Sequence, residues 1–281
     1  PTCSLGTNSK PCGAKRKVLA TVTIRAAAPA ANLRLRRRPM TEISGVWETP
    51  QKILVILAHP DDPEFFCGAT LALWARAGHE ITYLLLTCGD KGFNPVTQAD
   101  MTTKKLCALR HTEQRNAADV IGAKAVHFLD VEDGYLTPSI DLRRDIVREI
   151  RRYKPDILVT CDPQNLFALY GLNHPDHRAC GQVVLDAVFP AAGNKVFFSE
   201  LLDKGFEPHM PKEVWCSLTT QPNIIVDVTE TWDIKLQAIL EHKTQVQDAD
   251  KLIERMKARH AQNSSDEHPR YEETFKVVKY D

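Results

Sequence analysis

The sequence has no apolar run of about 18 residues, the length that a transmembrane helix needs. Its 36 basic and 36 acidic residues balance to a net charge of zero, so no overall charge favours nucleic acid or a membrane surface. Neither GxGxxG nor GxxxxGK[ST] occurs, which counts against a nucleotide site. The 281 residues suffice for one large α/β domain or two small ones, with the composition of a soluble globular protein.

Paired cysteine motifs are also missing. The eight cysteines are scattered without any CxxC pair, and several lie inside apolar runs. A free cysteine in such a run behaves as a small hydrophobic residue. We therefore expect reduced core thiols in a cytoplasmic protein, and no disulfide framework.

Acidic residues are absent from residues 1–39. This segment carries nine lysines and arginines, so residues 40–281 carry a net charge of −9 in a neutral chain. Its Ala- and Arg-rich composition suits an organelle transit segment, a disordered basic arm that binds an acidic partner, or upstream sequence translated in error before a start at Met40. We favour the last alternative and expect residues 40–281 to form a single α/β domain.

Strands and helices are expected to alternate through the middle of the chain. Short apolar runs typical of strands buried on both faces occur at 53–58, 80–87, 124–129 and 156–161. Helical patterns occupy 64–78, 104–121, 139–153 and 175–188. This alternation predicts parallel βαβ units in a Rossmann-like, doubly wound, mostly parallel sheet with helices on both faces. Beyond it we expect a strand pair (213–219 with 223–228), two helices (230–244 and 246–261) and a last strand (275–280).

Two polar clusters follow predicted strands. The tripeptide His-Pro-Asp occurs at 59–61, directly after a strand, and again at 174–176, where a helix begins. In a doubly wound sheet, ligands bind beyond the carboxyl ends of the strands. Each aspartate alone would suit a helix cap, but two matching clusters favour a metal site. Together they supply three histidines and three aspartates: His59, His174, His177, Asp61, Asp62 and Asp176.

The ligand types restrict the metal only in part. A catalytic zinc takes three nitrogen or oxygen ligands from the protein and keeps an open position for water. Fe²⁺ or another divalent ion accepts the same histidine and carboxylate ligands, so the sequence favours Zn²⁺ without excluding these.

These motifs resemble a known family. Ala-His-Pro-Asp-Asp at 58–62, followed much later by His-Pro-Asp-His at 174–177, resembles the zinc-dependent N-acetylglucosamine deacetylases called LmbE-like or PIG-L. Residues 109–113 are similar to the family's R-x-x-E helix, and Asp133-Gly134 to its acidic substrate loop. The family's late "D…K…A…H…Q" helix is matched by Asp227, Lys235, Ala238, His242 and Gln245. The resemblance covers about residues 50–250.

The resemblance implies a role for each site residue. His59, Asp62 and His177 would bind zinc, and Asp61 would be the general base. His174 would stabilise the oxyanion or protonate the leaving amine, oriented by Asp176. The expected contacts to sugar or phosphate are Arg110, Asp133, Arg178 and Tyr170, although salt bridges inside the fold suit both arginines equally well.

The sequence departs from the family pattern at two positions. Pro63 stands where most members have glutamate after the second aspartate, which would shift the start of the helix but leaves the ligand positions intact. Leu172 stands where some sugar-thiol members have tyrosine, so Tyr170 is the substitute we consider.

The expected activity is hydrolysis of the acetamide of an N-acetylglucosamine-containing small molecule or glycoside by metal-activated water. The alternatives are a Rossmann-like binding protein with a structural metal and a metal-dependent phosphoesterase. Inositol glycosides, malate glycosides, chitin fragments and antibiotic intermediates all remain open as substrates, and so does a homo-oligomeric state. No nucleic-acid partner and no membrane span are expected.

Overall fold

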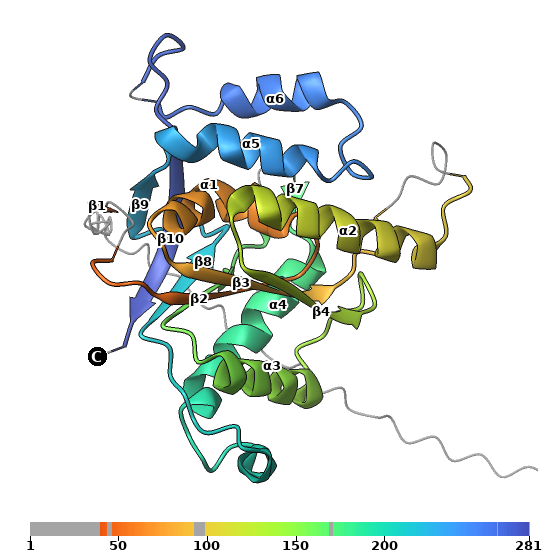
Figure 1. Ribbon diagram of the computed structural model, residues 1–281, viewed down its shortest axis with the longest axis vertical. Coiled ribbons are helices and arrows are strands. Elements are labelled where there is room, and N and C mark those ends of the chain that lie inside the picture. The colour runs from red at the N-terminus through yellow and green to blue at the C-terminus, as the bar shows by residue number, and fades with distance from the viewer. Residues whose placement is uncertain (1–39, 44–46, 93–98, 169–170, 263, 281) are drawn as a thin grey trace, which may run out of the picture. The chain divides into compact units, whose positions relative to one another are not determined.

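An eight-stranded sheet organises the protein. The computed structural model describes residues 40–43, 47–92, 99–168, 171–262 and 264–280. The strand order is β1-β9-β10-β8-β5-β2-β3-β4 (Figure 1). The strands are β1 (Thr41–Ile43), β2 (Lys52–Leu57), β3 (Glu80–Thr87), β4 (Ala125–Val131), β5 (Ile157–Cys161), β8 (Glu213–Ser217), β9 (Ile224–Asp227) and β10 (Glu272–Lys279). Only β10 runs antiparallel to its neighbours within this described sheet, so the predicted mostly parallel sheet is confirmed.

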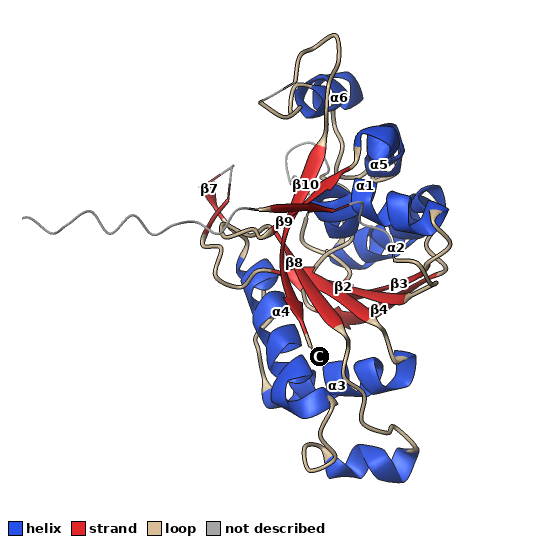
Figure 2. Ribbon diagram, turned by 90° about the vertical axis from the view of Figure 1, so that its left-hand side faces the viewer, coloured by secondary structure: helices blue, strands red, loops and turns tan. Residues whose placement is uncertain are grey.

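Helices cover both faces of the sheet (Figure 2). One face carries α1 (Asp62–Arg76), α2 (Thr103–Ile121) and α5 (Trp232–Leu240), with α6 (Ala249–Lys257) beside α5. The other face carries α3 (Ile140–Tyr153) and α4 (Pro175–Asp186). Alternate residues of β2 enter the two cores: Ile53, Val55 and Leu57 one, Leu54 and Ile56 the other. Because both faces of this strand are buried, its sequence is a continuous apolar run rather than an alternating one.

The C-terminal strands depart from the sequence prediction. The pairing of 213–219 with 223–228 is wrong, because β10 lies between β8 and β9 and pairs with both. This last strand begins at Glu272, three residues before the predicted start, and its inward side chains are Glu273, Phe275 and Val277. The segment between β5 and α4 contains a small hairpin, β6 (Phe167–Ala168) with β7 (Gly171–Leu172).

The cysteine prediction is wrong for one pair. A disulfide joins Cys88, just after β3, to Cys107 on α2, whereas Cys67, Cys161, Cys180 and Cys216 are free and buried as expected. The two bonded residues are 19 positions apart, and only the packing of α2 beside the end of β3 brings them together. The predictions for residues 1–39 and for Tyr170 lie outside the described residues.

None of the helices in the described part of the chain is both long and apolar enough to cross a membrane.

Candidate active site

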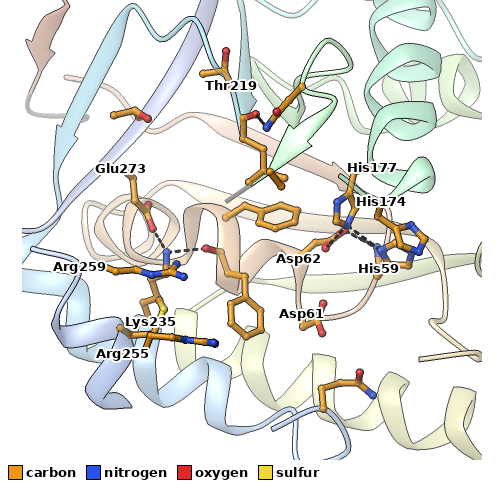
Figure 3. A pocket seen from close by; sticks show the side chains of 18 of the residues that line it. His59, Asp61, Asp62, His174, His177, Thr219, Lys235, Arg255, Arg259 and Glu273 are labelled. Carbon is orange, nitrogen blue, oxygen red and sulfur yellow. Dashed lines mark hydrogen bonds and ion pairs between the residues drawn. The ribbon is translucent and has the colours of Figure 1, made fainter. Parts of the chain in front are cut away.

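Both His-Pro-Asp clusters open onto one cavity of about 850 Å³ beyond the carboxyl ends of β2 and β5 (Figure 3). His59 comes from the turn between β2 and α1, and Asp62 is the first residue of α1. His174 and His177 come from the start of α4. Because β2 and β5 are parallel neighbours, the segments that follow them reach the same edge of the sheet. The predicted meeting of the two clusters therefore holds in the structure.

Three side chains converge at the inner end of the cavity. His177 Nε2 lies 3.0 Å from Asp62 Oδ1 and 3.2 Å from His59 Nδ1. His59 Nδ1 lies 3.4 Å from Asp62 Oδ2. Nitrogen and oxygen ligands held about 2.0–2.1 Å from a tetrahedral ion stand about 3.3–3.4 Å apart, so these spacings fit one ion.

His59 and His177 each have an inner ring nitrogen, which points toward the other candidate ligands, and an outer one, which points away. The hydrogen bond of the outer nitrogen determines whether the inner nitrogen carries a proton. His59 Nε2 faces the carboxylates of Asp133 (3.1 Å) and Asp176 (3.4 Å), so it must donate. His177 Nδ1 lies 2.8 Å from Asn173 Oδ1, and the amide of Asn173 is oriented by its own bond from Nδ2 to the Asn165 carbonyl. In neutral rings, both inner nitrogens therefore present lone pairs.

Two lone pairs and a carboxylate facing one another need a cation between them. Burial alone would lower the pKa of His59, but the attraction of Asp62 and hydrogen bonds to carboxylates outweigh it and raise this pKa well above its ordinary value. Burial opposes ionisation of Asp62, yet His177 and His59 hold its pKa below the usual range. Protons or one divalent ion would satisfy this site, and its two nitrogens and one carboxylate suit Zn²⁺ or Fe²⁺.

Asp61 lies beside the candidate ligands in a left-handed backbone conformation, φ 89°. This turn separates its side chain from that of Asp62, and both line the cavity (Figure 3). The Gln114 side chain accepts from the Asp61 backbone N–H at 2.8 Å. Burial raises the pKa of the Asp61 carboxyl, and the Arg110 guanidinium only partly offsets this. A carboxylate with a raised pKa is better suited to take a proton from water near neutral pH.

Arg110 forms the internal salt bridge that was one of its two predicted roles. Its Nη2 donates to Asp61 Oδ2 at 3.0 Å and to the Pro60 carbonyl, and its Nη1 donates to the Gly89 carbonyl at 3.1 Å. Gly89 has a φ of +64°, and a Cβ there would lie 2.0 Å from Arg110 Nη1. Arg110 also lines the cavity, so it holds Asp61 at the edge of the space that a substrate would occupy.

His174 and Asp176 have different partners from those expected. The Asp176 carboxylate accepts from the Gly134 and Leu136 backbone N–H groups (2.7 and 3.3 Å) as well as facing His59, so it ties the loop after β4 to the site. His174 is instead oriented by the Asp176 backbone N–H, which donates to His174 Nδ1 at 3.2 Å. Burial and the neighbouring His59 lower the pKa of His174. A neutral His174 then carries its hydrogen on Nε2.

The remaining predicted contacts divide into two groups. Asp133 lines the cavity but binds His59, so its first role is to orient a candidate ligand. Arg178 lies on α4 and is not among the described residues that line the cavity. Tyr170 lies outside the described residues.

The sequence analysis assigned no role to the residues that hold the candidate ligands and Asp61 in place. Asn173 stood inside the second cluster without a role, two residues before the helix that carries His177. Gln114 bridges Asp61 to Glu64, its Nε2 lying 3.0 Å from Glu64 Oε1, and Glu64 Oε2 in turn lies 3.0 Å from His242 Nε2. Glu64 and His242 are fully buried, so this network fixes the turn that carries Asp61.

Known proteins resemble this chain in sequence and in fold. It matches the PIG-L family, GlcNAc-PI de-N-acetylase, over residues 54–188. Diacetylchitobiose deacetylase from Thermococcus kodakarensis is 33% identical over 195 residues, which cover 69% of this chain and 70% of that protein. The chain belongs to the PIG-L family.

Two further PIG-L relatives agree with this assignment. A probable N-acetyl-alpha-D-glucosaminyl L-malate deacetylase 2 from Bacillus cereus is 26% identical, over 69% of this chain and 84% of that protein. The solved N,N'-diacetylchitobiose deacetylase from Pyrococcus horikoshii superposes with a TM-score of 0.73 and 28% identity, covering 82% of this chain and 84% of that one. The resemblance expected from the motifs is thereby confirmed, together with the fold.

Proposed function

We propose that this protein is a metal-dependent deacetylase that hydrolyses the acetamide of an N-acetylglucosamine-containing small molecule or glycoside. One observation carries the proposal: three acceptor atoms of His59, Asp62 and His177 converge on one point, and Asp61 lies beside them in the same cavity. Zn²⁺ is the proposed ion, and Fe²⁺ is the alternative that the same ligands accept.

The side chains divide the work of the reaction. A divalent ion held by the three ligands would polarise the acetamide and lower the pKa of water. Asp61 accepts a proton as the water oxygen attacks the carbonyl carbon. His174 donates a hydrogen bond from Nε2 to the oxygen on which negative charge develops. The C–N bond then breaks as the nitrogen takes up the proton that Asp61 accepted, and acetate and a free amine leave.

The cavity favours a substrate larger than one sugar. Its volume of about 850 Å³ lies toward the upper end of typical ligand pockets. Aromatic side chains line it, namely Phe65, Phe66, Phe167 and Trp232. Aromatic rings offer flat apolar surfaces to the C–H faces of a sugar. The deacetylases related to this chain are named for diacetylchitobiose and for a glucosaminyl malate, which are both of this size class.

The two alternative functions find less support. A two-metal phosphoesterase needs a second ion about 3.5–4 Å from the first. At the cavity, the described residues offer one further set, His59 with His174 and Asp176, and it shares His59 with the first. A structural metal site needs no carboxylate beside the ligands, yet Asp61 is held there in an unfavourable left-handed backbone conformation, φ 89°.

Metal content and amine release together test the proposal. We expect about one zinc or iron per chain by elemental mass spectrometry, and release of acetate from N,N'-diacetylchitobiose or another N-acetylglucosaminide. His177→Ala should lose both. His209→Ala is the matched control, because that ring binds the Pro155 carbonyl at 2.7 Å and does not line the cavity. A wild-type protein that holds no metal after reconstitution would contradict the mechanism.

The domain division and the location stay predictions. Deleting residues 1–39 should leave catalysis unchanged if residues 40–281 form the whole catalytic domain. The predicted cytoplasmic location loses part of its basis, since Cys88 and Cys107 are bonded to each other rather than reduced.

A further inference from the structure

We propose that Arg255 and Arg259 form an anion-binding subsite at the end of the cavity away from the candidate metal centre. The group bound there would be a carboxylate or phosphate on the part of the substrate that departs with the amine. This inference rests on the proposed function and adds that the substrate carries a negative charge. Figure 3 shows the two arginines across the cavity from His59, His174 and His177, and all five side chains line it.

The other charged side chains of the cavity wall already have partners. Lys235 Nζ lies 2.6 Å from Glu273 Oε1, and Arg110 binds Asp61. Glu272 lies 2.9 Å from Arg270, a residue outside the cavity wall. Among the described residues, no ion pair or side-chain hydrogen bond involves the guanidinium of Arg255 or of Arg259. The cavity therefore holds two positive charges that no described residue neutralises.

The spacing of the two arginines makes this arrangement unfavourable by itself. Arg255 lies on α6 and Arg259 two residues beyond its end, and both guanidinium groups line the same cavity, where like charges repel. Partial desolvation lowers the pKa of the Arg259 guanidinium, and the neighbouring Arg255 lowers it further. An anion between the two groups would remove this repulsion and could accept hydrogen bonds from both forks.

The helix that carries them is fixed against the core. Met256, between the two arginines in sequence, is 1% exposed and belongs to the same hydrophobic core cluster as Trp232. Leu252 and Ile253 pack against this cluster as well. The arginines thus extend from an anchored segment toward a cavity whose volume of about 850 Å³ has room for a sugar at the metal end and a charged group at the other.

Matched substrates test the subsite. We would compare methyl N-acetylglucosaminide, which is neutral, with N-acetylglucosamine 1-phosphate and with N-acetylglucosaminyl malate. We expect the wild-type protein to prefer the anionic compounds by about 10–100-fold in kcat/KM. Arg255→Ala/Arg259→Ala should remove this preference through KM, with kcat and the neutral substrate unchanged. The phosphate and malate arms distinguish the two sources of negative charge.

Lys257→Ala is the control, because Lys257 has the same charge on the same helix but does not line the cavity. Equal kcat/KM for neutral and anionic compounds in the wild-type protein would overturn the subsite. So would an equal loss for both classes in the double variant.

Failure of the proposed function gives a different result. If no compound is turned over, calorimetric binding of the phosphate and methyl compounds to the wild-type protein and the double variant still decides. Tighter binding of the phosphate compound that disappears in the double variant supports the subsite without deacetylation. Equal binding of the two compounds to the wild-type protein refutes it.

Discussion

The two ends of the cavity are built differently. At the metal end, His59, Asp62 and His177 are between 3% and 7% exposed, and each is held by other side chains or by the backbone. At the other end, Arg255 and Arg259 are exposed, and no described residue binds them. A site for bond breaking needs fixed geometry, whereas a site that recognises a charge needs an unsatisfied group. The difference indicates that chemistry and substrate selection are separated along one cavity.

The largest expected effect comes from removing the proposed base. Asp61→Asn should lower kcat by about 10²–10⁴-fold, because an amide cannot take the proton from water. Asparagine tolerates the left-handed backbone at this position, so the turn should persist. Elemental analysis should find the metal content unchanged, since Asp61 is not a proposed ligand.

Asp130→Asn is the control for this variant, because Asp130 is an exposed aspartate that also has a positive φ, 53°. It should keep wild-type activity. Metal-loaded Asp61→Asn with full activity would exclude Asp61 as the base.

The second largest effect is expected in the cavity wall between the metal end and the arginine end. The Lys235–Glu273 ion pair is buried, and Glu273 also accepts from the Ala69 and Thr70 backbone N–H groups (3.3 and 2.8 Å). Lys235→Met leaves the Glu273 charge buried without its cation, so we expect the free energy of unfolding to fall by about 3–5 kcal/mol in chemical denaturation.

Removing both charges should recover part of this loss. Lys235→Met/Glu273→Gln leaves no buried charge, so it should be more stable than the single variant. A single variant within about 1 kcal/mol of wild type would mean that this wall contributes little to the fold.

A smaller effect is expected from Asn173, which hydrogen-bonds the candidate ligand His177. Asn173→Ala removes the acceptor that keeps His177 Nδ1 protonated and Nε2 free, so metal affinity should weaken by about 10–100-fold in competition with a chelator. Asn173→Asp keeps the acceptor for His177 but loses the Nδ2 donor to the Asn165 carbonyl, so it should weaken metal affinity less than Asn173→Ala does. Asn194→Ala, at an exposed position away from the cavity, should change nothing. If Asn173→Asp and Asn173→Ala weaken binding equally, the hydrogen bond to His177 is not what matters.

The sequence predicted the parts that local pattern encodes. The run at 80–87 coincides with β3, because a strand buried on both faces is apolar at most positions rather than at alternate ones. The candidate ligands lay in two short motifs at strand ends, where the topology itself brings them together. The place of β10 between β8 and β9 could not be predicted, because strand pairing depends on contacts across more than 40 residues.

The cavity-lining position of Arg255 and Arg259 could not be predicted either, because it also depends on packing between distant parts of the chain. Residues 246–261 were predicted only as a charged helix, because a basic residue that faces a cavity has the same local sequence signature as one that faces water. Arg259 lines the cavity and Lys257 does not, although both are basic residues of the same short stretch. The disulfide between Cys88 and Cys107 was missed because it also depends on packing across the chain.

The smallest expected effect is that of ionic strength, which should weaken anion recognition at the arginines more than hydrolysis at the metal end. Raising the ionic strength from about 0.1 M to about 1 M shortens the Debye length from about 10 Å to about 3 Å, which screens exposed charges far more than buried ones. The preference for an anionic over a neutral N-acetylglucosaminide should therefore shrink severalfold, measured as a ratio of kcat/KM values. Hydrolysis of the neutral compound should change less than about twofold, because its chemistry takes place at the buried metal end. A preference that survives high salt would place anion recognition in a desolvated part of the cavity and not at the exposed arginines.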